Sequence, residues 1–147
     1  MKKTAKANIK ISQAIGKVLG INFRNEEFSL GTWGDVDNWC RLTDETLVLL
    51  ECENSGQKHP NTNVVKIYPY LEESAHIRVI LIHYLSPENK APKNRVKLCN
   101  FFGKKMEAEF SDRFQYVHLK CQQELIEENL SQHKSRLMKL LKAGQNG

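Results

Sequence analysis

Two carboxylates stand at the end of a strongly apolar segment. Glu51 and Glu53 follow the apolar run 47–50, which is typical of a buried strand. Side chains alternate along a strand, so these two acids point to the same face. Two like charges on an apolar strand are unfavourable unless a cation lies between them. A second acidic pair, Asp35 and Asp37, lies about a dozen residues upstream. Carboxylates on neighbouring strands at this spacing suit Mg²⁺ or Mn²⁺, ions that most often serve phosphoryl chemistry.

A hairpin would bring the two acidic pairs together. Residues 35–42 and 46–53 both show strand patterns and are joined by a short polar turn. In the register that this turn favours, Asp37 lies opposite Glu51. Asp35 faces the same way in a regular strand and is the alternative first acid, and a bulge nearby would change that geometry. The competing interpretation is a set of solvated acids at a strand edge.

Apolar periodicity and turn residues predict the elements that position these acids. Strands are expected at 28–30, 35–42, 46–53, 76–84 and 114–119. Helices are expected at 5–19, at 94–110 and at 122–142. A further helix is expected to begin at a cap formed by Asn61 or Thr62 and to end at 73, with a kink or break at Pro69. This order predicts an α/β fold with a mixed β-sheet, in which a β-meander precedes parallel central strands and helices flank the sheet. Residues 1–143 would form a single domain, and 144–147 a disordered tail.

The composition is that of an ordinary globular domain. The 147 residues are 40% hydrophobic and 27% charged, which suits one domain with a core of its own. The net charge of +5 and the pI near 9.0 favour contact with polyanions. No apolar run is long enough to span a bilayer, and no apolar signal core follows the basic start of the chain, so no membrane association is expected.

Four cysteines are scattered through the chain without a Cys-x-x-Cys motif. They are Cys40, Cys52, Cys99 and Cys121. We expect buried free thiols rather than zinc ligands, because no Cys/His cluster has ligand spacing. A cytoplasmic location follows as the default for such a chain.

The order of acids and elements resembles the restriction-endonuclease-like, or PD-(D/E)xK, nuclease superfamily. Its pattern is an Asp, a gap, and then (Asp/Glu)-x-Lys on the following strand. The resemblance covers roughly residues 5–85, with a continuation to about 120. It implies Asp37 as the first acid and Glu51 as the second. Glu53 stands where Lys is usual, although a minority of these nucleases carry Glu-x-Glu.

The next predicted helix offers a replacement for the missing cation. Lys66-x-x-x-Tyr70 stands where several exonuclease-like members carry Gln-x-x-x-Tyr. Lys66 and Tyr70 are one helical turn apart and share a helix face. We therefore expect Lys66 to reach the same cleft as the acids.

The resemblance implies a Mg²⁺- or Mn²⁺-dependent nuclease, with DNA favoured over RNA. Asp37 and Glu51 would bind the metal together with the carbonyl of Cys52. Glu53 would complete the shell or orient the attacking water, and Lys66 would pair with the scissile phosphate.

The loop after the acidic strand supplies further nucleic-acid-binding candidates. Gln57, Lys58 and His59 follow the strand directly, and the resemblance adds Tyr70, on the helix face that carries Lys66. The alternative is that 57–59 form an ordinary polar surface loop.

Two other functions stay open on the sequence. One is a non-catalytic nucleic-acid-binding domain that keeps the nuclease fold. The other is a small assembly module whose helix at 122–142 binds a partner. The apolar stripe of that helix suits core packing, or a homodimer. His83, at the end of the apolar run 76–84, is expected to have an ordinary strand-end role.

Overall fold

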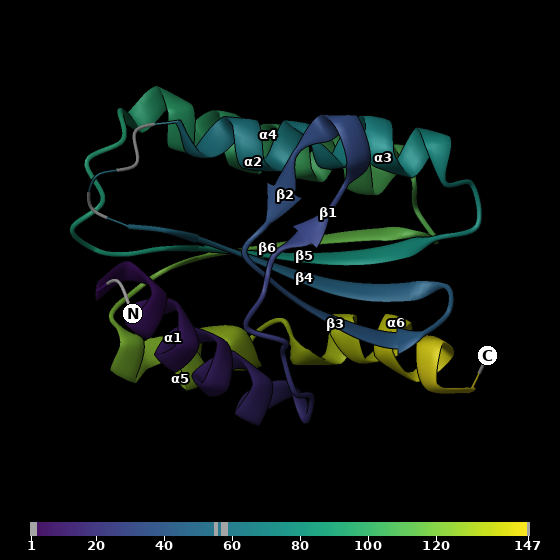
Figure 1. The fold of residues 1–147 in the computed structure, drawn as a ribbon, viewed down its shortest axis with the longest axis horizontal. Coiled ribbons are helices and arrows are strands. Elements are labelled where there is room, and N and C mark those ends of the chain that lie inside the picture. Colours follow the sequence, from purple (N-terminus) through teal and green to yellow (C-terminus); the bar gives the residue numbers. More distant parts are fainter. Residues whose placement is uncertain (1–2, 55, 57–58, 147) are drawn as a thin grey trace.

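Four strands form a mixed sheet in the middle of the protein, with helices on both faces (Figure 1). The computed structural model describes residues 3–54, 56 and 59–146. The strands, in spatial order, are β3 (Asn38–Thr43), β4 (Thr46–Glu53), β5 (Arg78–Leu85) and β6 (Phe114–Lys120). β3 is antiparallel to β4, whereas β4, β5 and β6 are parallel. The α/β fold with a mixed sheet and parallel central strands is confirmed.

The strand that carries the acids is β4, and it coincides with the predicted range 46–53. All eight of its residues are buried, since it lies between β3 and β5 and under helices on both sides. β3 pairs with it so that Asn38 lies opposite Leu50. The preceding residue, Asp37, therefore comes beside Glu51, as the hairpin register predicted.

The upper face of the sheet, as drawn in Figure 1, is covered by three helices. They are α2 (Pro60–Val65), α3 (Ile67–Glu73) and α4 (Lys93–Glu109). The predicted helix up to residue 73 is broken after Val65, because Pro69 has no N–H to donate to the Val65 carbonyl. Lys66 stands at this break. The predicted cap at Asn61 or Thr62 is wrong, since α2 begins with Pro60, whose fixed φ suits a first helical turn.

The lower face is covered by the two ends of the chain (Figure 1). The elements here are α1 (Lys3–Leu19), the 3₁₀ turn η2 (Gln123–Leu125), α5 (Ile126–Ser131) and α6 (Lys134–Asn146). α1 ends at Gly20, whose φ of 71° is the left-handed conformation of a helix C-terminus.

The single long helix predicted at 122–142 is wrong, because this region forms η2, α5 and α6. α5 packs on α1 and α6 packs under β3 and β5. Residues 122–142 contain no Gly or Pro that would announce the break. α6 continues to Asn146, where the sequence predicted a tail from 144, and Gly147 lies outside the described residues.

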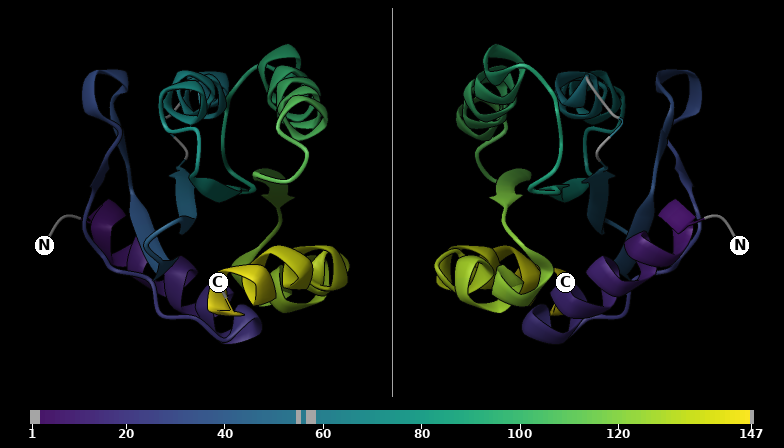
Figure 2. Two further views of the ribbon diagram at one scale, coloured as in Figure 1. Left: turned by 90° about the vertical axis from the view of Figure 1, so that its right-hand side faces the viewer. Right: turned by 90° about the vertical axis from the view of Figure 1, so that its left-hand side faces the viewer.

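A small hairpin stands in front of the main sheet. β1 (Phe28–Ser29) pairs with β2 (Asp35–Val36) around the 3₁₀ turn η1 (Gly31–Trp33). The predicted strand 35–42 is thus interrupted at Asp37, and the first strand of the expected meander belongs to a separate two-stranded sheet. The views of Figure 2 place this hairpin beside α2 and α3, on the side away from α4.

Two apolar cores lie on the two faces of the sheet. Even-numbered residues of β4, such as Val48 and Leu50, pack into the lower core with α1, α5 and α6. Odd-numbered ones, such as Leu47 and Leu49, pack into the upper core with α2, α3 and α4. The alternation of side chains along a strand sends Glu51 to the upper side.

Candidate functional site

Glu51 and Glu53 lie on the upper face of β4 and are almost completely buried. Their residues are 3% and 1% exposed, and they lie on the same face of the sheet as the upper apolar core. A buried carboxylate is stable only when it is paired or hydrogen-bonded. The two acids meet this requirement in different ways.

Lys66 is held at the break between α2 and α3 by three oxygen atoms. Its Nζ lies 2.6 Å from Glu51 Oε1 and 2.8 Å from Asn63 Oδ1, and it also donates to the backbone carbonyl of Asp35. These contacts use all three donors of the ammonium group. The side chain of Lys66 is 15% exposed, so the ion pair with Glu51 is well shielded from water. We call Asp37, Glu51, Glu53, Asn63 and Lys66 the Lys66 cluster.

Asp37 joins this cluster from the bend between β2 and β3. Its Oδ2 accepts a hydrogen bond of 3.0 Å from the backbone N–H of Cys52, which fixes the carboxylate at the end of the β3–β4 ladder. The alternative first acid, Asp35, is exposed and enters the cluster through its backbone carbonyl. Of these two acids, Asp37 is the one whose carboxylate lies beside Glu51.

Glu53 has partners of its own. Its Oε1 accepts from Asn63 Nδ2 and lies 2.9 Å from His83 Nε2. An ionised carboxylate only accepts, so Nε2 of His83 carries a proton. Asn63 thus touches Glu53 with its nitrogen and Lys66 with its oxygen.

The polar contacts continue across the sheet from His83. Its Nδ1 lies 2.9 Å from the Tyr116 hydroxyl on β6, which in turn lies 3.2 Å from His118 Nδ1. Gly103 of α4 rests on the Tyr116 ring, where a Cβ would lie 2.2 Å from the ring carbon Cδ1. Only a glycine allows α4 to approach this ring so closely.

The two acids differ in how readily they ionise. Burial raises the pKa of the Glu51 carboxyl well above its usual range, the charge of Asp37 raises it further, and Lys66 lowers it only in part. Burial also acts to raise the pKa of Glu53, but the hydrogen bond and charge of His83, with smaller contributions, outweigh it and the pKa is lowered. Lys66 therefore compensates only in part for the burial of Glu51 and for the nearby charge of Asp37, and a further cation would favour the ionised form of Glu51.

The oxygen atoms around Glu51 suit a hard divalent cation. Within residues 3–54, 56 and 59–146, no group of three or more His, Cys, Asp and Glu side chains could hold a metal ion. Mg²⁺ does not need such a cage, because it keeps several waters and commonly binds one or two carboxylates plus substrate phosphates. Asp37 and Glu51 supply two carboxylates. The carbonyl of Cys52 points to the same side of β4 as its N–H, toward Asp37.

The predicted nucleic-acid-binding residues contact other partners or lie outside the described residues. The ring of Tyr70 stacks on Phe28 of β1, with 6.2 Å between centroids. His59 is exposed at the start of α2, and its Nε2 lies 3.4 Å from Arg95. Gln57 and Lys58 lie outside the described residues.

Three members of the polar network were not expected from the sequence. Asn63 and Tyr116 had no predicted role, and the strand-end role predicted for His83 is wrong, because His83 is fully buried in the central strand β5. Asn63 offered one signal, since it lies three residues before Lys66 and so on the same helical face. Tyr116 offered none, because its partner His83 is distant in sequence.

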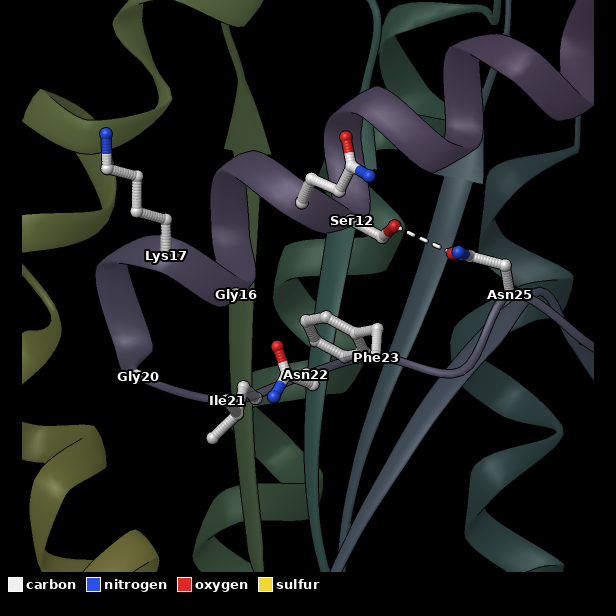
Figure 3. A pocket seen from close by; sticks show the side chains of 9 residues that line it. Ser12, Gly16, Lys17, Gly20, Ile21, Asn22, Phe23 and Asn25 are labelled. Atoms are coloured by element: carbon white, nitrogen blue, oxygen red, sulfur yellow. Dashed lines mark hydrogen bonds between the residues drawn. The ribbon is translucent and has the colours of Figure 1, made fainter.

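The surface hollow in Figure 3 is a separate feature. It has a volume of about 410 Å³ and lies beside the second half of α1 and the segment that follows it. Ser12 points toward Asn25 and donates a hydrogen bond of 3.0 Å to it. Lys17 is the single charged side chain among the nine residues that line it. The hollow therefore contains no residue of the Lys66 cluster.

The thiol groups of the cysteines take no part in the site. All four are free and buried, as the sequence predicted. Burial, followed by the charges of Asp37 and the two glutamates beside it, raises the pKa of the Cys52 thiol. Such a thiol stays protonated and unreactive.

Comparisons with known proteins found no relative. No family model matches the chain, and neither the curated proteins nor the solved structures contain a significant match. In the part of the chain that the structure describes, no helix is both long and apolar enough to cross a membrane.

Proposed function

We propose that this protein is a divalent-metal-dependent nuclease that hydrolyses phosphodiester bonds, with DNA as the expected substrate. The observation that carries the proposal is the convergence of Asp37, Glu51 and Lys66. They come from three separate elements and meet beside the buried end of β4. Two adjacent acids and a nearby ammonium group suit the needs of phosphodiester hydrolysis.

Each residue has a distinct task in this proposal. Asp37 and Glu51, with the carbonyl of Cys52, would hold Mg²⁺ or Mn²⁺. The metal would activate a water and neutralise charge on the phosphate oxygens. Lys66 Nζ, 2.6 Å from Glu51 Oε1, would exchange one of its present acceptors for a phosphate oxygen brought to these carboxylates. Glu53 would not bind the metal in this proposal, because its carboxylate is bonded to His83 and Asn63. The net charge of +5 favours a polyanionic substrate.

Cleavage assays test this function directly. The purified protein is incubated with supercoiled plasmid, with branched and single-stranded DNA, and with RNA, each in Mg²⁺, Mn²⁺ or EDTA. We expect cleavage that needs the metal and that falls by roughly 100-fold or more in Glu51→Gln and Lys66→Met. The exposed residues Glu45 and Lys97 supply the matched controls Glu45→Gln and Lys97→Met, which retain activity. Full activity in Glu51→Gln would refute the proposed site.

A non-catalytic nucleic-acid-binding domain is the second candidate. It is favoured by one observation: all three donors of Lys66 already have acceptors within the protein. Lys66 would then serve as a built-in cation for Glu51 in place of a metal. Under this alternative, labelled DNA binds equally in Mg²⁺ and EDTA, and no substrate is cleaved.

The assembly-module alternative has less support. The apolar stripe of the C-terminal segment fills the lower core of the same chain. Its buried members are Ile126, Leu130, Leu137, Leu140 and Leu141. Those side chains are therefore not presented to a partner or to a second copy. A homodimer would need another surface.

A further inference from the structure

Asn63 is the link between the two halves of the Lys66 cluster. It lies one helical turn before Lys66 on α2. A side-chain amide has an acceptor end and a donor end, and here both ends are used. Nδ2 donates to Glu53, while Oδ1 accepts from Lys66 over 2.8 Å.

Glu53 determines which way this amide is turned. Its carboxylate has no proton to give, so only the NH₂ end of Asn63 can face it. The oxygen end is then left for Lys66. With the amide reversed, the NH₂ group of Asn63 would face the Lys66 ammonium, donor against donor, and Lys66 would lose one of its three acceptors.

His83 in turn fixes Glu53. Its Nε2 lies 2.9 Å from Glu53 Oε1, the same atom that accepts from Asn63. His83 is 0% exposed and is oriented on its other side by the Tyr116 hydroxyl, so the imidazole has little freedom to turn. A continuous chain of polar contacts thus leads from β6 through β5 and β4 to the ammonium group at the start of α3.

We propose that His83 and Glu53 are positioning residues for Lys66, acting through the orientation of Asn63. Glu53 stands where the nuclease superfamily usually carries Lys, and here it would help to position Lys66, which approaches from the helix. The consequence for catalysis rests on the proposed nuclease function, whereas the position of Lys66 can be measured without any turnover.

The direct test observes the Lys66 ammonium in the full-length protein labelled with ¹⁵N-lysine. Hydrogen bonds to three protein acceptors slow proton exchange with water, so a distinct Nζ signal is expected, assigned by its loss in Lys66→Met. His83→Leu and Asn63→Ala should broaden or remove the signal. His83→Gln should keep it, because a glutamine amide can donate to Glu53 from nearly the same place as Nε2.

Two further variants keep the test decisive. Tyr116→Phe removes a single oxygen from the far end of this series of polar contacts and should weaken the Lys66 signal. It replaces His83→Leu in the test if that variant does not fold. Ser12→Ala removes another buried hydroxyl, one that bonds to Asn25 on the opposite side of the sheet, and should leave the signal unchanged. An unaltered Lys66 signal in both Asn63→Ala and His83→Leu or Tyr116→Phe would overturn the proposal.

Kinetics separate this proposal from the proposed function. In an active protein, His83→Leu should lower kcat by roughly tenfold or more with little change in KM, and His83→Gln should restore it. A parent protein that cleaves no substrate refutes the nuclease and leaves the spectroscopic result to decide the positioning role. In an active protein, equal kcat in the parent and in His83→Leu would contradict the positioning role of His83.

Discussion

The two faces of β4 begin alike and end differently. On the lower face Val48, Leu50 and Cys52 continue one apolar core to the end of the strand. On the upper face Leu47 and Leu49 start an equivalent core, but the next two positions are acids. The strand is equally buried on both sides, so the difference is one of chemistry and not of depth.

The two faces of β4 differ in what they contribute to stability. The lower face buries apolar area and needs nothing further. The upper face carries desolvated charges that cost free energy unless partners from α2, β2 and β5 compensate for them. Buried ionisable groups of this kind are found mainly at functional sites, where the chemistry requires them despite their cost in stability.

The largest expected effect comes from breaking the lower face. Leu50 is fully buried, so Leu50→Ala should lower the free energy of unfolding by about 2–5 kcal/mol through lost transfer energy and the cavity left behind. Urea denaturation followed by circular dichroism measures the loss. The rate of cleavage by the remaining folded protein should stay within about twofold of the parent. A collapse of kcat in a folded Leu50→Ala would mean that the two faces are not separable.

The two acids should respond to pH in opposite directions. The pKa of Glu53 is lowered from its ordinary value of 4.5, so this group adds stability above pH 4.5 that is lost as the pH falls through the folded-state pKa. Glu53→Gln should therefore cost about 1.5–3 kcal/mol at pH 7. The difference from the parent should shrink as the solution becomes acidic.

Glu51 supplies the contrasting case. Its pKa is raised, so the folded protein holds this proton more tightly than the unfolded chain does. Stability contributed by Glu51 is present at pH 4.5 and falls as the pH rises toward the folded-state pKa. Relative to the parent, Glu51→Gln should therefore gain stability as the pH rises over that range, and the proposed function predicts that the same variant loses activity. Urea midpoints from about pH 2 to pH 8 check both acids, because the Glu53 effect disappears below pH 4.5 and the Glu51 effect develops above it. The same trend in both would refute the assignment.

A change on α4 should disturb the upper face from a distance. In Gly103→Ala the new Cβ would meet the Tyr116 ring, and overpacking of this kind costs about 1–3 kcal/mol. The displaced hydroxyl should also weaken the contact with His83. Combining Gly103→Ala with Tyr116→Leu should recover part of the stability but not the Lys66 signal. Thermal unfolding and the lysine spectrum measure the two effects independently.

The smallest effect is expected at the hairpin in front of the sheet. Trp33 Nε1 donates to Glu73 on α3 over 3.0 Å in an exposed position. Trp33→Phe removes this bond and should change stability by no more than about 0.5 kcal/mol, because water replaces an exposed partner readily. Thermal unfolding checks it. A larger loss would show that the hairpin helps to hold the neighbouring Lys66, whose Cδ lies 4.0 Å from where a Cβ on Gly34 would be.

Local patterns predicted much of this fold. The eight residues of β4, the helix that ends at Gly20 and the break associated with Pro69 all follow from short-range rules of periodicity, turn chemistry and the missing proline donor. The register that places Asp37 beside Glu51 was also predictable, since a short turn fixes the pairing of a hairpin.

Distant contacts decided the rest. The helix predicted at 122–142 breaks because its two halves pack on different neighbours, and no residue inside it signals the change. Asp37 interrupts its strand because the residues before it pair with β1. Such outcomes depend on which surfaces meet, and a single sequence window does not contain that information.

The candidate site divides in the same way. The sequence by itself singled out Asp37 and Glu51 as candidates, because carboxylates at the end of an apolar strand are unusual, and the resemblance to the nuclease superfamily added Lys66. Only the tertiary structure showed that Glu53 turns to His83 and Asn63, and that Tyr116 supports them from another strand. The reason is physical: a hydrogen bond between side chains depends on the orientation of both groups in space, and the parallel strands that bring these groups together are joined by long crossovers.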